Sequence, residues 1–283
     1  MSLHNIAVIG AGTMGNGIAQ VCARSGLPVT LLDISDAALE RGMATIRKNL
    51  ERQVNKQVIT EDEAATALHR IHCTTDYAAL NDADWVIEAA TENLELKLRL
   101  LKQIAEHVSA DCVIASNTSS LSITQLAASV NNPERFIGLH FFNPVPVMGL
   151  IEVIRGLQTS DLTHFQALEM ATRLNKTAIT AGNRPGFVVN RILVPMINEA
   201  ILVLQEGLAS AQDIDDGMRL GCNQPIGPLA LADLIGLDTL LAIMQAFYDG
   251  FNDSKYRPAP LLREMVAAGY LGRKTGRGFH SYN

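Results

Sequence analysis

The chain has 283 residues, of which 48% are hydrophobic and 18% are charged, and its formal net charge is -6. This length and composition are typical of a soluble globular protein with one large or two ordinary domains. The acidic balance argues against a nucleic-acid partner, and no apolar run approaches the roughly 18 residues of a membrane span. The start "MSLHNIAVIGAG" has no secretory-signal pattern, so we expect a cytoplasmic protein.

The four cysteines are Cys22, Cys73, Cys112 and Cys222. They form no CxxC pair and have no metal-ligand spacing. We therefore predict reduced thiols and no metal site.

The first third of the chain alternates strand and helix patterns. The run "NIAVIG" at 5–10 predicts a strand, "TMGNGIAQVCARSG" at 13–26 a helix, and "PVTLLD" at 28–33 a second strand. Such a βαβ unit of about 30 residues indicates a parallel sheet. The long polar stretch at 36–72 predicts two helices, inserted before the sheet resumes.

Further strands are predicted in the middle of the chain, and helices dominate after it. The strand patterns lie at 84–90, 112–117, 135–141, 149–156 and 177–182. From residue 188 onward we find only helical patterns, including a long helix with an internal proline. The expected fold is an N-terminal Rossmann-type, doubly wound and mostly parallel α/β domain at 1–183, with a helical insertion. An all-helical domain follows at 184–283.

A glycine-rich turn, "GAGTMG", lies between the first strand and the first helix. In this context, Gly10 permits the tight turn, Gly12 lets the backbone approach a pyrophosphate, and Gly15 allows close packing of helix and strand. Asp33 ends the second strand, where a carboxylate binds the ribose hydroxyls of NAD and repels the extra phosphate of NADP. We therefore predict NAD, although a glycine turn without a ligand is the alternative. The predicted contacts here are Gly10, Gly12, Thr13, Met14, Gly15 and Asp33.

Several stretches together resemble the short-chain L-3-hydroxyacyl-CoA dehydrogenases, a family that includes bacterial 3-hydroxybutyryl-CoA dehydrogenases. They are "VIGAGTMGNGIAQ", "VIEAATENLELK", "ASNTSSLSI", "GLHFFNPVPVMGLIEV", "RPGFVVNRILVPMINEA" and "GYLGRKTGRGF". The resemblance implies NAD-dependent oxidation of a short (S)-3-hydroxyacyl-CoA to the 3-ketoacyl-CoA and its reverse, as in fatty-acid β-oxidation. It also implies a homodimer formed through the C-terminal helices.

The resemblance also implies site residues. His140 and Glu152 match the family's catalytic pair, Ser119 and Asn190 match residues that bind the substrate oxygen, and Lys56 is a candidate CoA contact. The remaining implied cofactor contacts are Glu92, Lys97, Asn117 and Asn143.

The chemistry explains why these residue types suit the reaction. Oxidation of a secondary alcohol needs a base that takes the C3 hydroxyl proton as the hydride leaves. An unperturbed imidazole titrates at about pH 6.5 and can act as that base near neutrality. Glu152 would bind the far nitrogen of the imidazole, set its tautomer and stabilise the imidazolium.

Each residue also has a purely structural interpretation. His140 could be a buried, hydrogen-bonded histidine and Glu152 an exposed strand acid. Ser119 lies among hydroxyl residues that could cap a helix, Asn190 could bond within its own helix, and Lys56 could be a solvated surface lysine.

Three other functions stay open at this point. The first is an NAD-dependent dehydrogenase of a free β-hydroxy acid, although such enzymes use a lysine base. The second is a non-catalytic NAD-binding protein of the same fold. The third, a piece of a multifunctional β-oxidation protein, fits less well than a stand-alone dehydrogenase, because the chain begins at the nucleotide-binding strand.

Overall fold

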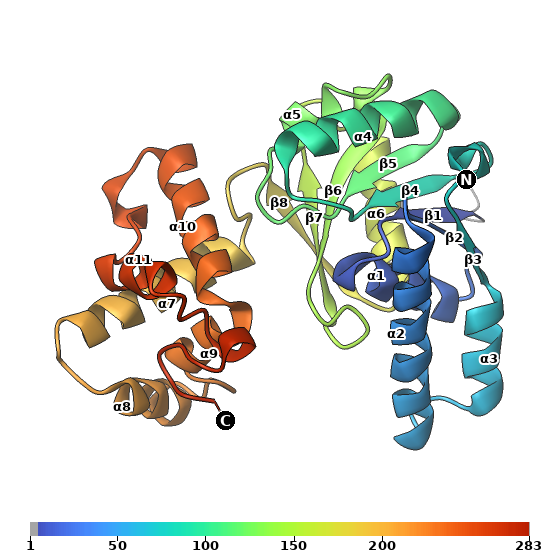
Figure 1. Cartoon of the computed structure of the whole chain (residues 1–283). Coiled ribbons are helices and arrows are strands. Elements are labelled where there is room, and N and C mark those ends of the chain that lie inside the picture. Colours follow the sequence, from blue (N-terminus) through green and yellow to red (C-terminus); the bar gives the residue numbers. More distant parts are fainter. Residues whose placement is uncertain (1–4, 283) are drawn as a thin grey trace. The chain divides into compact units, whose positions relative to one another are not determined.

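The structure is a computed structural model that describes residues 5–282. The chain divides into two compact units, Met1–Arg184 (unit 1) and Pro185–Asn283 (unit 2). The boundary expected from the sequence falls between residues 183 and 184. Each unit is described by itself below (Figure 1).

Unit 1 is built on one eight-stranded sheet in the order β3-β2-β1-β4-β5-β6-β7-β8. Strands β1 to β6 are parallel, β7 is antiparallel to β6, and β8 is parallel to β7. The strand order reverses direction between β1 and β4, which is where ligands bind in open α/β sheets. The strands are β1 Ile6–Ile9, β2 Val29–Leu32, β3 Ile71–Thr74, β4 Trp85–Glu88, β5 Val113–Ser116, β6 Phe136–Phe141, β7 Leu150–Arg155 and β8 Thr177–Gly182.

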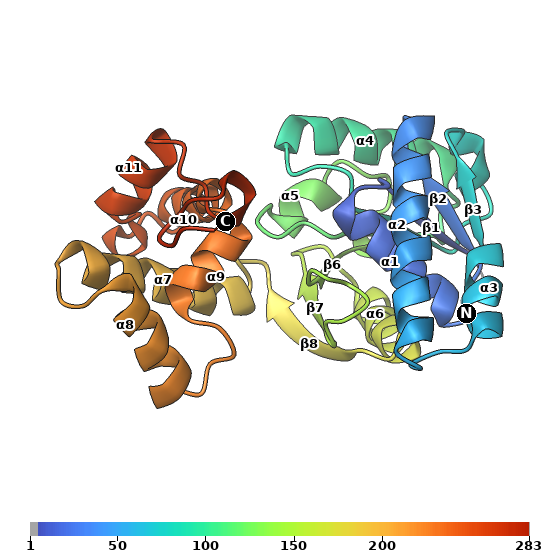
Figure 2. The ribbon, with the colours of Figure 1, turned by 60° about the horizontal axis from the view of Figure 1, so that its bottom comes forward.

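Helices cover both faces of this sheet, so the unit is doubly wound (Figures 1 and 2). The α-helices are α1 Thr13–Arg24, α2 Asp36–Asn55, α3 Glu61–His69, α4 Leu94–His107, α5 Ile123–Ala127 and α6 Asp161–Arg173, with 3-10 turns η1 Tyr77–Leu80 and η2 Pro133–Arg135. Helices α2 and α3 form the inserted hairpin. Thr60 begins α3 with a capping box, in which its side chain and that of Glu63 each bind the other's backbone N–H.

The expectation of a continuous helical stretch up to residue 72 was wrong at its end. Residues Ile71–Thr74 form β3, which pairs with β2 at one edge of the sheet. The segment "IHCT" is short and only partly buried, so it lacks the apolar run that reveals a central strand. The backbone hydrogen bonds to β2, rather than a local pattern, stabilise it.

Unit 2 is helical apart from two isolated bridges near its end. Its elements are α7 Val189–Gln205, α8 Ala211–Asp216, the π-turn η3 Gly217–Gly221, α9 Pro228–Ile235, α10 Leu237–Phe251, η4 Ser254–Tyr256, α11 Pro260–Ala267 and η5 Arg273–Thr275. Pro195 lies inside α7, as expected, and Gly236, with φ +100°, separates α9 from α10. Together the two units confirm the predicted fold class.

The two units have separate hydrophobic cores. The apolar run "LLAIMQAF" in α10 buries Leu240, Met244 and Phe247 inside unit 2. That run therefore needs no partner to cover it. Within the described residues, no single helix has the length and apolarity to cross a membrane, and α9 with α10 would pass only as a pair bent by 98°.

Candidate active site

The glycine turn after β1 has the geometry of a nucleotide cradle. Gly10 has φ +99°, and a Cβ on Gly15 would lie 1.7 Å from the carbonyl oxygen of Gly10. A Cβ on Gly12 would meet nothing within 4 Å, so there is open space above that backbone. Gly12 precedes α1 without a side-chain cap, which leaves the helix N-terminus available to an anion. The residues present therefore fit a dinucleotide.

The flanking residues extend this cradle. Thr13 opens α1 and is exposed, and Met14 is partly buried behind it. The half-buried carboxylate of Asp33 accepts hydrogen bonds from the N–H of Ala11 (2.8 Å) and of Ser35 (3.2 Å). Asp33 thus holds the turn in shape, in addition to the ribose contact predicted for it.

His140 and Glu152 are direct cross-strand partners. The register of β6 and β7 pairs His140 with Glu152, so a spacing of twelve residues becomes a contact. His140 Nδ1 lies 2.7 Å from Glu152 Oε2, and the two residues are 6% and 0% exposed. The imidazole also packs on Phe142, with ring centroids 4.6 Å apart. The proton-transfer role stays a prediction, but the contact it needs is present.

Glu92 and Ser119 meet where the loops after β4 and β5 run side by side. The carboxylate of Glu92 accepts hydrogen bonds from the backbone N–H of Ser119 (2.8 Å) and from the hydroxyl of Thr118 (2.7 Å). The Ser119 hydroxyl itself is 3.3 Å from Glu92. Two residues predicted separately, one for the cofactor and one for the substrate, are therefore held together.

Lys97 lies in a buried cluster that the sequence did not reveal. Its Nζ is 2.5 Å from Glu88 Oε2 and 3.3 Å from Ser116 Oγ, and the Ser116 hydroxyl donates to Glu88 at 2.7 Å. Lys97 is 1% exposed and Glu88 0%. The cofactor contact predicted for Lys97 stays a prediction. The only sequence signal for this cluster was an acid ending a buried strand pattern, in "VIEAA".

Asn117 links the end of β5 to the catalytic strand. Its side-chain oxygen accepts the N–H of Phe141 at 2.8 Å, directly after His140, and its own N–H donates to the carbonyl of Glu88. Asn143 lies just beyond this strand and is exposed. Their predicted contacts with the cofactor stay predictions.

Two predicted residues lie away from this group. Lys56 is exposed at the C-terminal end of α2. Asn190 is in the first turn of α7 and belongs to unit 2, so neither unit by itself brings it to His140.

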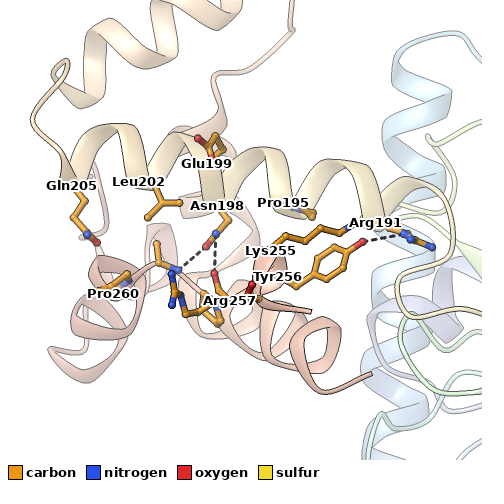
Figure 3. A pocket seen from close by; sticks show the side chains of 13 residues that line it. Arg191, Pro195, Asn198, Glu199, Leu202, Gln205, Lys255, Tyr256, Arg257 and Pro260 are labelled. Atoms are coloured by element: carbon orange, nitrogen blue, oxygen red, sulfur yellow. Dashed lines mark hydrogen bonds between the residues drawn. The ribbon is translucent and has the colours of Figure 1, made fainter. Parts of the chain in front are cut away.

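Unit 2 has a cleft of its own between α7 and residues 254–260, of about 700 Å³ (Figure 3). None of the predicted site residues lines it, although Arg191, the neighbour of Asn190, does. The Arg191 guanidinium lies 4.4 Å from the centroid of the Phe251 ring, and its Nε donates to the Tyr256 hydroxyl at 3.3 Å.

Comparison with known proteins agrees with this geometry. Residues 5–184 match the family model of the 3-hydroxyacyl-CoA dehydrogenase NAD binding domain, and residues 186–282 match that of the 3-hydroxyacyl-CoA dehydrogenase C-terminal domain. The 3-hydroxybutyryl-CoA dehydrogenase of Bradyrhizobium diazoefficiens is 51% identical over 280 residues, which cover 99% of this chain and 96% of the relative. That of Clostridioides difficile is 47% identical over 278 residues, which cover 98% of this chain and 99% of the relative.

A solved structure is similar along its whole length. The (S)-3-hydroxybutyryl-CoA dehydrogenase of Ralstonia eutropha has a TM-score of 0.98 and 61% identity, and the match covers 100% of both chains. The predictions of family, of an NAD-dependent oxidoreductase and of NAD as cofactor are confirmed. The chain belongs to the 3-hydroxyacyl-CoA dehydrogenase family.

Proposed function

We propose that this protein oxidises short-chain (S)-3-hydroxyacyl-CoA thioesters, 3-hydroxybutyryl-CoA among them, to the 3-ketoacyl-CoA, and catalyses the reverse reduction. The observation that carries the proposal is the buried His140–Glu152 pair, whose atoms lie 2.7 Å apart. The names of the relatives support the choice of substrate.

In the proposed proton transfer, His140 and Glu152 act together. Glu152 binds Nδ1 of His140, and Nε2 would accept the proton of the C3 hydroxyl. As the imidazole becomes positive, the carboxylate of Glu152 stabilises it. In the reverse direction, His140 returns the proton to the oxygen at C3.

The cofactor site supplies the other half of the reaction. NAD, when bound, accepts the hydride from C3. Gly10, Gly12 and the N-terminus of α1 would hold its pyrophosphate, and Asp33 would hold its adenosine ribose. Burial of His140 and Glu152 keeps water away from the proton-transfer pair.

Three further residues are assigned to the substrate. Ser119, whose backbone N–H is held by Glu92, would bind the oxygen at C3, and Asn190 would donate to the same oxygen. Lys56, which is exposed at the end of α2, would contact the CoA phosphates.

The proposal also covers the oligomeric state of the protein, its location in the cell and its pathway. The protein would work as a cytoplasmic homodimer in fatty-acid β-oxidation, without nucleic-acid or membrane partners. Because Leu240, Met244 and Phe247 of α10 are buried in the core of unit 2, the dimer surface would instead use exposed apolar side chains of this unit. Ile192 in α7 and Leu234 in α9, which are 68% and 54% exposed, are candidates.

An NADH absorbance assay with acetoacetyl-CoA tests the substrate assignment, with NADPH and with free acetoacetate as comparisons. We expect turnover with NADH and the thioester only. Turnover of the free acid without the thioester would favour the free-acid dehydrogenase, and no turnover with any pair would favour the non-catalytic protein.

His140→Gln tests the base. General-base catalysis contributes typically 10²–10⁴-fold, so we expect a drop in kcat of about that size with NADH binding unchanged. A variant that retains the wild-type rate would remove His140 from the mechanism.

A further inference from the structure

The cluster of Glu88, Lys97 and Ser116 lies at the carboxyl edge of the sheet in unit 1. Glu88 is the last residue of β4, Ser116 the last residue of β5, and Lys97 lies in the first turns of α4. All three side chains are buried, and Lys97 and Glu88 form an ion pair at 2.5 Å. None of the chemistry proposed above uses the Glu88 carboxylate.

A buried ion pair is not explained by stability alone. Removing two charges from water costs several kcal/mol per ion, and well-packed apolar residues in the same place are often neutral or stabilising. This pair lies at the strand ends where open α/β sheets bind their ligands. We therefore interpret the Lys97–Glu88 pair as a contact that organises the ligand site at these strand ends.

One oxygen of Glu88 shapes the turn that supports the glycine loop. Glu88 Oε1 accepts the N–H of Ala90 at 2.9 Å. The backbone of this turn lies directly against Gly10, because a Cβ on Gly10 would be 2.7 Å from Ala90 Cα and 2.9 Å from the carbonyl oxygen of Ala89. A shift of the Ala89–Ala90 turn would therefore displace the first glycine of the nucleotide cradle.

The other oxygen connects to the substrate side. Glu88 Oε2 accepts both Lys97 Nζ and the Ser116 hydroxyl, and Ser116 Oγ in turn accepts the N–H of Thr118 at 3.4 Å. Thr118 donates its hydroxyl to Glu92, which holds Ser119. Glu88 is thus the residue common to the cofactor turn and the serine loop.

We propose that Glu88 is a positioning residue for the hydride-transfer site. Its carboxylate, held by Lys97 and Ser116, sets the cofactor loop at Gly10 and the Ser119 loop relative to each other. Lys97 acts through Glu88 in this arrangement. The inference rests on the NAD part of the proposed function and not on which acyl substrate the protein takes.

Two matched double variants separate positioning from charge. Glu88→Gln with Lys97→Met removes the ion pair but keeps an amide oxygen that can accept the N–H of Ala90, while its amide nitrogen can donate to the Ser116 hydroxyl. Glu88→Met with Lys97→Met removes the ion pair and the acceptor together, at similar volume. Both avoid a lone buried charge. The dissociation constant of NADH is measured by its fluorescence, together with Tm and the KM for NADH.

Both proteins lack the Lys97 ammonium, so a cofactor contact made by Lys97 itself would weaken NADH binding equally in both, and the two variants are compared with each other. The Met/Met protein should bind NADH about tenfold more weakly than the Gln/Met protein, the loss expected from one or two hydrogen bonds, at a similar Tm. Its KM for NADH should rise while kcat at saturating NADH changes less. Equal, wild-type binding by both proteins would overturn the inference. An equal loss in both would also overturn it, because Lys97 would then act through its own charge.

A third variant keeps the test decisive if the Met/Met protein does not fold. Ser116→Ala leaves the ion pair in place and removes the Ser116 hydroxyl, which contacts Lys97 and Glu88 and links them to the Thr118 loop. It should raise the KM for acetoacetyl-CoA about threefold or more at unchanged Tm, and no change would contradict the proposal. Asp216→Asn, which breaks the exposed Arg219–Asp216 pair of unit 2, is the control and should change neither quantity. Because NADH binding needs no acyl substrate, a failure of the substrate assignment would be visible separately.

Discussion

Both units bury carboxylates, but these carboxylates meet different kinds of partner. In unit 1, Glu152 is bound to the imidazole of His140 and Glu88 to the ammonium of Lys97. These contacts join side chains at or near the strand ends. Each partner there is ionisable, so a proton or a charge can be redistributed between the two groups.

In unit 2 the partners are mainly backbone amides. Asp215 accepts the N–H of Leu229 and of Ala230 at the start of α9. Asp233 accepts the N–H of Phe279 and of His280, which ties the C-terminal segment to α9. His280 and Tyr282 add side-chain contacts to these two carboxylates.

The comparison of partners helps to separate buried acids that can take part in proton transfer from buried acids that hold the chain in place. A backbone amide does not give up its proton, so the amide bonds of Asp215 and Asp233 only hold the chain in place. An imidazole can exchange a proton with a substrate, and a carboxylate beside it changes how readily it does so. Unit 2 has such a contact too, between His280 and Asp215, so the partner together with the place at the strand ends distinguishes the buried acids of unit 1.

The largest expected effect comes from Glu152→Gln. Glutamine can still bond to the imidazole but cannot stabilise the imidazolium, so we expect kcat to fall about 10²-fold or more. Steady-state kinetics with a parallel measurement of NADH binding checks this, and the binding should not change. A kcat within a few fold of wild type would contradict the expectation that the buried acids of unit 1, unlike those of unit 2, serve catalysis.

Asp233→Asn should act on stability instead. The new amide would place a donor against the N–H of Phe279 or of His280, which leaves buried polar groups unpaired. We expect a loss of about 2–4 kcal/mol in the free energy of unfolding, measured by urea titration. The kcat per folded molecule at low temperature should stay near wild type, and a selective loss of kcat would show that this acid also serves chemistry.

The cysteines of the two units are expected to differ in their reactivity towards thiol reagents. Burial raises the pKa of Cys22 and of Cys112, both in unit 1, to about 12, so little thiolate forms near neutrality. Cys222 in unit 2 is exposed. A thiol reagent should modify Cys222 rapidly in the native protein and should reach Cys22 and Cys112 only on unfolding. Rapid native modification in a Cys222→Ser variant would contradict this assignment, unless it maps to the partly buried Cys73.

The smallest effect is expected from the exposed Lys274–Asp238 pair of unit 2. Hydrogen bonding to Lys274 holds the pKa of Asp238 below its ordinary value. A lowered pKa contributes stability that is present above the ordinary aspartate range and is lost as the pH falls through the folded-state pKa. Asp238→Asn should therefore lower the free energy of unfolding slightly at neutral pH, by about 1 kcal/mol or less, and the difference should vanish in acid. A difference that grows toward low pH would have the wrong sign.

Much of the fold could be predicted because its signals are local. The βαβ pattern, the glycine turn and the switch to helical periodicity after residue 188 are all contained in short windows of sequence. The edge strand β3 was missed because no local signal marks it. Its four residues, three half-buried and one exposed, carry no periodicity, and only pairing with β2 makes them a strand.

The site was predictable residue by residue but not as a set of contacts. Nothing in the sequence indicated that Glu92 holds Ser119, or that Lys97 is buried on Glu88. Glu92 and Ser119 are 27 residues apart and meet because β4 and β5 are neighbours in the sheet. Glu88 and Lys97 are nine residues apart and meet because of how the chain passes from β4 into α4.

By itself, the sequence determined the class of fold and the cofactor and predicted the reacting side chains, because residue types and short spacings encode them. Only the tertiary structure decided which of those side chains touch. The spacing of twelve residues between His140 and Glu152 could have kept them apart. The antiparallel register of β6 and β7 makes them neighbours, because backbone hydrogen bonding across the two strands fixes which side chains lie opposite each other.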